Sequence, residues 1–192
     1  MMVDRKNKEQ VDWINAFNEA CEKGKVKKVT ELLGSPHANV NLYDPTWHRG
    51  PLHWACVNNR VKIVKMLLAA GAKNTIEGRR GLDPIQHAIP EGFHQVVRAC
   101  LDSGVDPNYQ SEPESTCPMS KAAIEGDEDM VKMMVRYGGV IEPWMIKIAR
   151  ANRDEDWVLY LEQFSARAER KTLDEDRGVR PGANSPKVRK GL

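Results

Sequence analysis

The 192-residue sequence predicts an all-α solenoid, in which short helix-turn-helix units stack side by side. Three windows beginning at Pro51, Pro84 and Pro118 align for more than twenty positions without a gap, at spacings of 33 and 34 residues. Alanine and glycine recur in the same columns of this alignment. Such a period is typical of units that are too small to bury their own apolar faces and that rely on their neighbours to do so.

The first helix of each unit is expected to begin at the aligned proline. Proline suits this position because its missing N–H would have no partner there, and Asp83 before Pro84 is a suitable capping residue. A small residue in a shared column lets a neighbouring helix approach closely. That column holds Ala55, Ala88 and Ala122.

The second helix follows a short polar break and carries apolar residues at helical spacing. In the unit that begins at Pro51 these include Ile63, Val64 and Leu67. Glycine then ends the helix, as is common where the backbone must turn left-handed. The three glycines in this column are Gly71, Gly104 and Gly138.

These motifs resemble the ankyrin repeat, whose pattern joins "G-x-TPLH-x-A" to "V-x-x-LL-x-x-GA". The best copy here reads "GPLHWA" followed by "VKMLLAAGA". The resemblance also has departures, because Gly50, Asp83 and Cys117 stand where the family has threonine, and the family's histidine is kept only at His53. It implies a stack of about five units, the outer two being degenerate caps, and protein binding as the function.

The resemblance gives the expected domain boundaries. An N-terminal extension covers residues 1–11, the ankyrin-repeat domain covers 12–163, and a basic, low-complexity extension covers 164–192. The expected units span residues 12–41, 42–74, 75–108, 109–141 and 142–163.

Composition predicts an intracellular protein, cytoplasmic or part of an organelle or cytoskeletal assembly. The sequence is 41% apolar and 29% charged, and it has no apolar stretch of the length that spans a membrane. Its four cysteines form no C-x-x-C pair, which indicates reduced thiols.

No catalytic or metal-binding motif is found, so we expect neither an enzyme nor a cofactor. The acidic run "GDEDM" at 126–130 lacks the later ligands of a calcium loop and is better explained as the start of a helix, where acids favour the positive end of the helix dipole. Cys21 and Cys56 share one column and are expected to be small buried residues. His53 occupies the family's structural position.

In ankyrin-like stacks the loops before the first helices, and the outward sides of those helices, form the concave surface that binds other proteins. Here these positions hold aromatic and basic residues, which are frequent in interface centres. The same residues could instead pack on neighbouring loops or be solvated. The predicted partner-binding residues are Trp47, His48, Arg49, Trp54, Arg79, Arg80, His87 and Tyr109, with Lys121 in the same outward slot as Trp54 and His87.

The C-terminal extension is a second candidate contact. Residues 166–192 contain eight Lys or Arg against four Asp or Glu and almost no large apolar residue. The predicted contacts are Arg180, Lys187, Arg189 and Lys190. We predict an adaptor or structural subunit with protein partners. The alternatives are a regulatory inhibitor that masks a partner and a ribonucleoprotein subunit that contacts RNA through the extension; no membrane or small-molecule substrate is expected.

Overall fold

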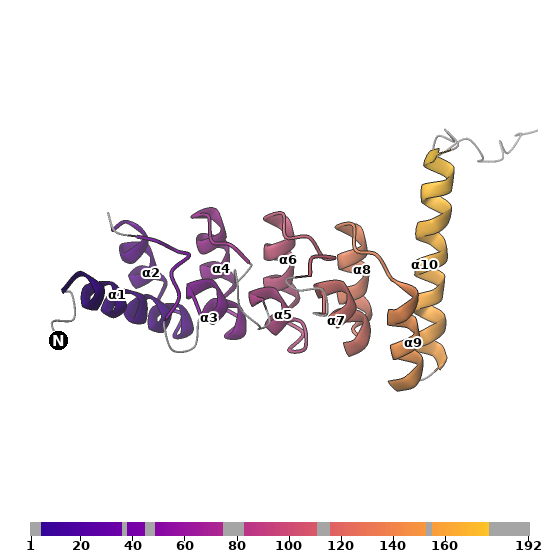
Figure 1. Ribbon diagram of the computed structural model, residues 1–192, viewed down its shortest axis with the longest axis horizontal. Coiled ribbons are helices and arrows are strands. Elements are labelled where there is room, and N and C mark those ends of the chain that lie inside the picture. Colours follow the sequence, from indigo (N-terminus) through magenta and orange to yellow (C-terminus); the bar gives the residue numbers. More distant parts are fainter. Residues whose placement is uncertain are drawn as a thin grey trace, which may run out of the picture. The chain divides into compact units, whose positions relative to one another are not determined.

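The computed structural model describes residues 5–35, 38–44, 49–74, 83–110, 116–152 and 155–176. The chain divides into two compact parts, Met1–Gly139 and Val140–Leu192. In the part of the chain that is described, all regular structure is helical, which confirms the predicted all-α class (Figure 1). None of the described helices combines the length and apolar character needed to cross a membrane.

The N-terminal part consists of four helix pairs that lie side by side (Figure 1). The first helices pack against each other in the order α1, α3, α5 and α7, and the second helices in the order α2, α4, α6 and α8. The pairs are α1 (Arg5–Glu22) with α2 (Val26–Leu33), α3 (Pro51–Val57) with α4 (Val61–Ala69), α5 (Pro84–Ala88) with α6 (His94–Asp102), and α7 (Pro118–Glu125) with α8 (Glu128–Arg136).

The alanine column lies in the seam between the first helices. Ala55, Ala88 and Ala122 are all fully buried. Because α3 packs on α5 and α5 packs on α7, a methyl group is the side chain that allows this close approach. The recurring alanines therefore mark the contacts between successive units, as the sequence predicted.

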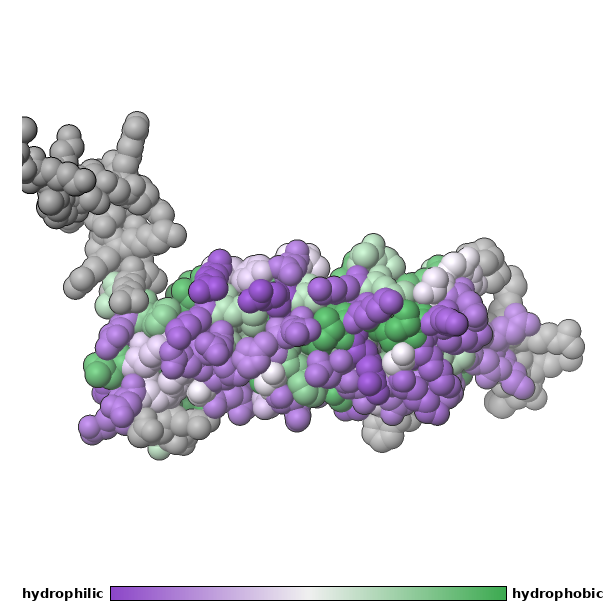
Figure 2. Space-filling view, turned by 180° about the vertical axis from the view of Figure 1, so that it is seen from behind, coloured by the Kyte–Doolittle hydropathy of each residue, from purple (hydrophilic) through white to green (hydrophobic). Residues whose placement is uncertain are grey.

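The second helices supply the other half of the core. Ile63, Val64 and Leu67 of α4 are buried, whereas hydrophilic residues predominate on the face of the molecule in Figure 2. The glycine that follows α4 is left-handed as predicted, with a φ of +85° at Gly71. An added Cβ there would meet no atom within 4 Å, so the backbone conformation and not space requires glycine. The chain then returns through a bond from Ala72 N–H to the Leu67 carbonyl, 2.9 Å.

One predicted cap is wrong in its detail. Asp83 precedes α5, but its side chain accepts no capping hydrogen bond. The N–H of Ile85 in the first turn instead donates to the buried Asn74 Oδ1, 3.0 Å away. By contrast, the acidic run at 126–130 does begin a helix, because Asp127 Oδ1 accepts from Met130 N–H at 2.9 Å.

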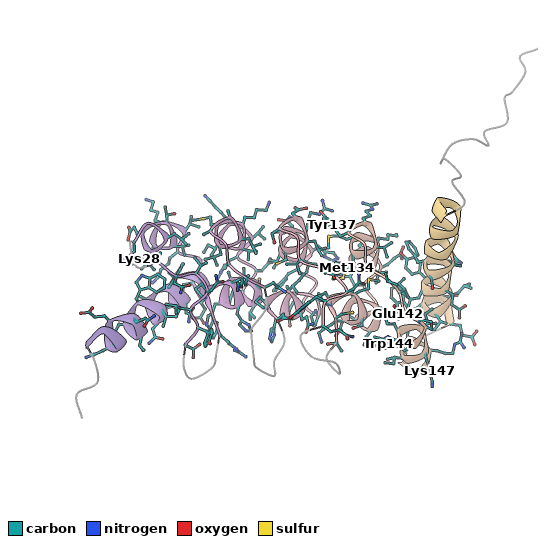
Figure 3. The ribbon with its side chains drawn as sticks, turned by 45° about the horizontal axis from the view of Figure 1, so that its top comes forward. Lys28, Met134, Tyr137, Glu142, Trp144 and Lys147 are labelled. Carbon is teal, nitrogen blue, oxygen red and sulfur yellow. The ribbon has the colours of Figure 1, made fainter. Side chains whose placement is uncertain are left out.

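Asparagines connect successive units near the helix ends. Asn41 donates from Nδ2 to the Gly71 carbonyl, 3.1 Å, and its Oδ1 accepts from Lys73 N–H, 2.8 Å. One double period later, Asn108 donates in the same way to the Gly138 carbonyl, 2.8 Å. These bonds fix the register of neighbouring units through the backbone. Tyr137, which follows α8 (Figure 3), makes a similar contact between units. Its hydroxyl donates a hydrogen bond to the carboxylate of Asp102 at the end of α6.

The C-terminal part holds one further helix pair, α9 (Pro143–Asn152) and α10 (Glu155–Asp176). The two helices pack against each other, and their buried residues include Met145, Ala149 and Leu161. Trp144 of α9 (Figure 3) remains 40% exposed. The expected boundary at residue 163 lies inside α10, which continues to Asp176.

Candidate partner-binding surface

Arg49 is held by its backbone at the entrance to α3. Its N–H donates to Asp44 Oδ2 at 3.1 Å, and its carbonyl accepts from Asp44 N–H at 3.2 Å. Asn18 of α1, a buried residue, donates to the same carbonyl from Nδ2 at 3.2 Å. These bonds use only backbone atoms of Arg49, so they position the residue while leaving its guanidinium out of these contacts.

The Arg49 guanidinium lies over Trp54 of α3. Its central carbon is 5.5 Å from the centroid of the indole, a cation–π geometry. Trp54 immediately precedes the seam residue Ala55 and is half-buried. Its indole Nε1 is buried and has no hydrogen-bond partner among the described residues. The pair offers an aromatic surface with a cation above it.

His87 occupies the equivalent outward position on α5, beside the seam residue Ala88. Its ring meets the ring of buried His53 edge to face, with the centroids 4.5 Å apart. Burial lowers the pKa of His53 to about 3, and the positive charges of His87 and Arg49 lower it further. The negative charge of Asp44 acts in the opposite direction. His53 is therefore neutral at physiological pH and serves packing, in agreement with its predicted structural role.

The pKa of His87 is also lowered, mainly by burial and then by the charges of Arg49 and Lys121. Lys121 lies in the matching position of α7, and its ammonium is 3.8 Å from the Glu125 carboxylate. Arg49, Trp54, His87 and Lys121 are all half-buried. We refer to Arg49, Trp54, His87 and Lys121 as the first-helix surface.

The predicted contact Tyr109 does not belong to this surface. Tyr109 is 37% exposed and lines a different hollow of about 370 Å³, together with Leu68 of α4 and Val105 after α6. Trp47, His48, Arg79, Arg80, Arg180, Lys187, Arg189 and Lys190 lie outside the described residues.

Sequence reasoning missed the support behind the surface. Asn18 carries no motif, and its role depends on α1 packing against α3, which no local pattern reveals. By contrast, the sequence alone shows that Trp54, His87 and Lys121 occupy the same repeat position, each one residue before a seam alanine.

Cys21 and Cys56 have the predicted character of core residues. Cys21, Cys56, Cys100 and Cys117 are buried and unbridged. Burial raises the pKa of Cys21 to about 12, and hydrogen bonding to Cys100 together with burial raises that of Cys56. Within the described ranges, no group of three His, Cys, Asp or Glu side chains could hold a metal ion.

The stacked helix pairs, the alanine seam and the glycine-ended second helices define a helical repeat protein with an outward surface on its first helices. Comparison with known families agrees: residues 3–78 match the family of ankyrin repeats (three copies). Residues 3–78 of the chain thus carry ankyrin repeats.

Relatives with different names share this region. The chain is 36% identical over 97 residues to "Palmitoyltransferase AKR1" of Kluyveromyces lactis, which is 50% of this chain and 13% of that protein. It is 36% identical over 91 residues to "Putative E3 ubiquitin-protein ligase XBAT35" of Arabidopsis thaliana, 44% of this chain and 20% of that protein. Human "Ankyrin repeat and KH domain-containing protein 1" is 30% identical over 89 residues, 46% and 4% of the two chains. The chain thus spans a small fraction of the length of these relatives.

Proposed function

We propose that this chain is a non-enzymatic protein-binding module, an adaptor or structural subunit of an intracellular assembly, and that its first-helix surface contacts the partner. The observation that carries the proposal is the half-buried Arg49 stacked over Trp54, next to His87. Arginine and tryptophan are among the residues that contribute most to interface energies. The four buried, unbridged cysteines support a reducing compartment.

The geometry favours binding because much of the ordering has already occurred in the free chain. Interfaces lose affinity when long side chains must be immobilised, at a cost of about 0.5–1.5 kcal/mol for each one. Here the backbone of Arg49 is fixed by Asp44 and Asn18, and its guanidinium rests on the indole of Trp54. The surface should therefore retain most of the interaction energy that its contacts provide.

Site-specific photocrosslinking tests this proposal. A photoreactive amino acid placed at His87 of the full chain, in cells that normally make it, should yield a defined adduct with one protein. The same group at Lys62, an exposed residue of the second helix α4, is the matched control. The adduct should disappear in Trp54→Ala, with folding checked by circular dichroism. Equal labelling from both positions, or an adduct that survives Trp54→Ala, would contradict the proposal.

The basic composition of residues 166–192 supports an alternative contact with RNA. Removing this extension separates the two possibilities. Loss of a strongly salt-dependent RNA affinity, with the His87 adduct unchanged, would favour a ribonucleoprotein subunit. A regulatory inhibitor would instead be recognised if the crosslinked partner loses its own activity when this chain is bound.

A further inference from the structure

The charges around the first-helix surface are unbalanced. His87 faces His53 of α3, Arg49 of the preceding segment and Lys121 of α7, and both charges that act on it are positive. Asp44 acts on His53, behind the surface, and binds the backbone of Arg49. Among the described residues no carboxylate pairs with the Arg49 guanidinium, and Glu125 is 3.8 Å from the ammonium of Lys121.

A half-buried cation without a paired carboxylate, as Arg49 is among the described residues, carries a cost that a ligand can relieve. Each of the four residues of the first-helix surface has lost part of its contact with water. A charge in that setting interacts more strongly with an incoming opposite charge than a fully solvated one does. The surface is therefore electrostatically incomplete, and an anion is the group that completes it.

We propose that the first-helix surface binds a segment of the partner protein that presents aspartate or glutamate carboxylates. The inference rests on the proposed function and specifies the partner's chemistry. One carboxylate would accept a pair of hydrogen bonds from the Arg49 guanidinium, whose planar fork matches its geometry. The apolar part of the same side chain would lie against Trp54. A second acidic side chain would lie between His87 and Lys121.

Binding of this kind is coupled to the protonation of His87. In the free chain, burial and then the charges of Arg49 and Lys121 lower the pKa of His87 and disfavour the protonated ring. A carboxylate at the surface favours it, so the complex takes up a proton that the free chain does not hold. Affinity must then increase as the pH falls toward the range in which histidine titrates. A carboxylate itself stays ionised over this range.

Peptide titrations followed by NMR of the full chain test the inference directly. The probes are a capped tetraglutamate peptide and its tetraglutamine isostere, each at about pH 7.5 and about pH 6. Tetraglutamate should shift the signals of Arg49, Trp54 and His87 and should bind at least about twofold more tightly at the lower pH, as expected for a partly exposed ion pair. Tetraglutamine should bind more weakly and without pH dependence.

Two pairs of variants assign the effect to individual side chains. Arg49→Gln keeps the backbone bonds to Asp44 and Asn18 and should weaken tetraglutamate binding roughly two- to fivefold. Lys65→Gln, at an exposed position of α4, should not. His87→Gln should remove the pH dependence. His94→Gln, which alters a histidine paired with Asp127, should leave that dependence unchanged.

The outcomes separate this inference from the proposed function. If both peptides bind equally at these residues, or if tetraglutamate shifts Lys62 and Lys65 instead, the carboxylate preference is wrong. Absence of any shift by tetraglutamate overturns it as well. The proposed function would still stand in each case if the His87 adduct forms and depends on Trp54. Loss of that adduct with intact tetraglutamate binding would instead overturn the proposed function while leaving the carboxylate preference of the surface.

Discussion

Replacing Ala88 with leucine tests the seam on which the architecture depends. Ala88 is fully buried on α5, which packs against α3 on one side and α7 on the other. If the seam had spare room, the larger side chain would stabilise the fold by up to about 2 kcal/mol through added apolar burial. Because the helices approach closely, we expect overpacking to cost about 1–3 kcal/mol instead. The sign of the change therefore reports the packing.

Urea denaturation of the full chain, followed by circular dichroism, gives the free energy of unfolding for this comparison. The expected cost corresponds to a fall of roughly 3–10 °C in melting temperature. Ala69→Leu is the matched control, because Ala69 is an exposed alanine on α4 and should change stability by less than about 0.5 kcal/mol. An Ala88→Leu protein as stable as the parent, or more stable, would refute a close-packed seam.

Three further substitutions test other parts of the fold. Gly139→Ala should lower the free energy of unfolding by about 1–3 kcal/mol in urea, because its Cβ would lie 2.9 Å from the Met134 carbonyl oxygen; an unchanged midpoint would contradict this. Gln86→Leu removes the bond from Gln86 Nε2 to the Thr116 carbonyl, 2.5 Å, and should cost about 1–3 kcal/mol in the same assay, whereas a neutral result would show that this bond adds nothing. The lowered pKa of His53 makes the unfolded chain bind a proton that the folded chain excludes between about pH 6.5 and about pH 3. Stability should therefore fall on acidification by up to about 1.4 kcal/mol per pH unit, and His53→Leu should remove that part of the slope.

The sequence predicted the repeat because its signals are local. Proline at the start of α3, α5 and α7 and glycine after α4, α6 and α8 act through the backbone of a single turn. Apolar spacing within α4 likewise needs only the helical period. The predicted cap at Asp83 was wrong because the contact is not local. The group that binds the first turn of α5 is Asn74, eleven residues away from Ile85.

The shared repeat position of Trp54, His87 and Lys121 could be predicted from the sequence in the same way, because each residue directly precedes a seam alanine. Their identity as one surface could not. The distance from Arg49 to the Trp54 indole and the contact between the His53 and His87 rings depend on how closely α1, α3 and α5 approach. That approach is set by packing across units. The sequence by itself determined which residues repeat and which vary, while the tertiary structure decided which variable residues share one electrostatic environment, because charges interact through space and not along the chain.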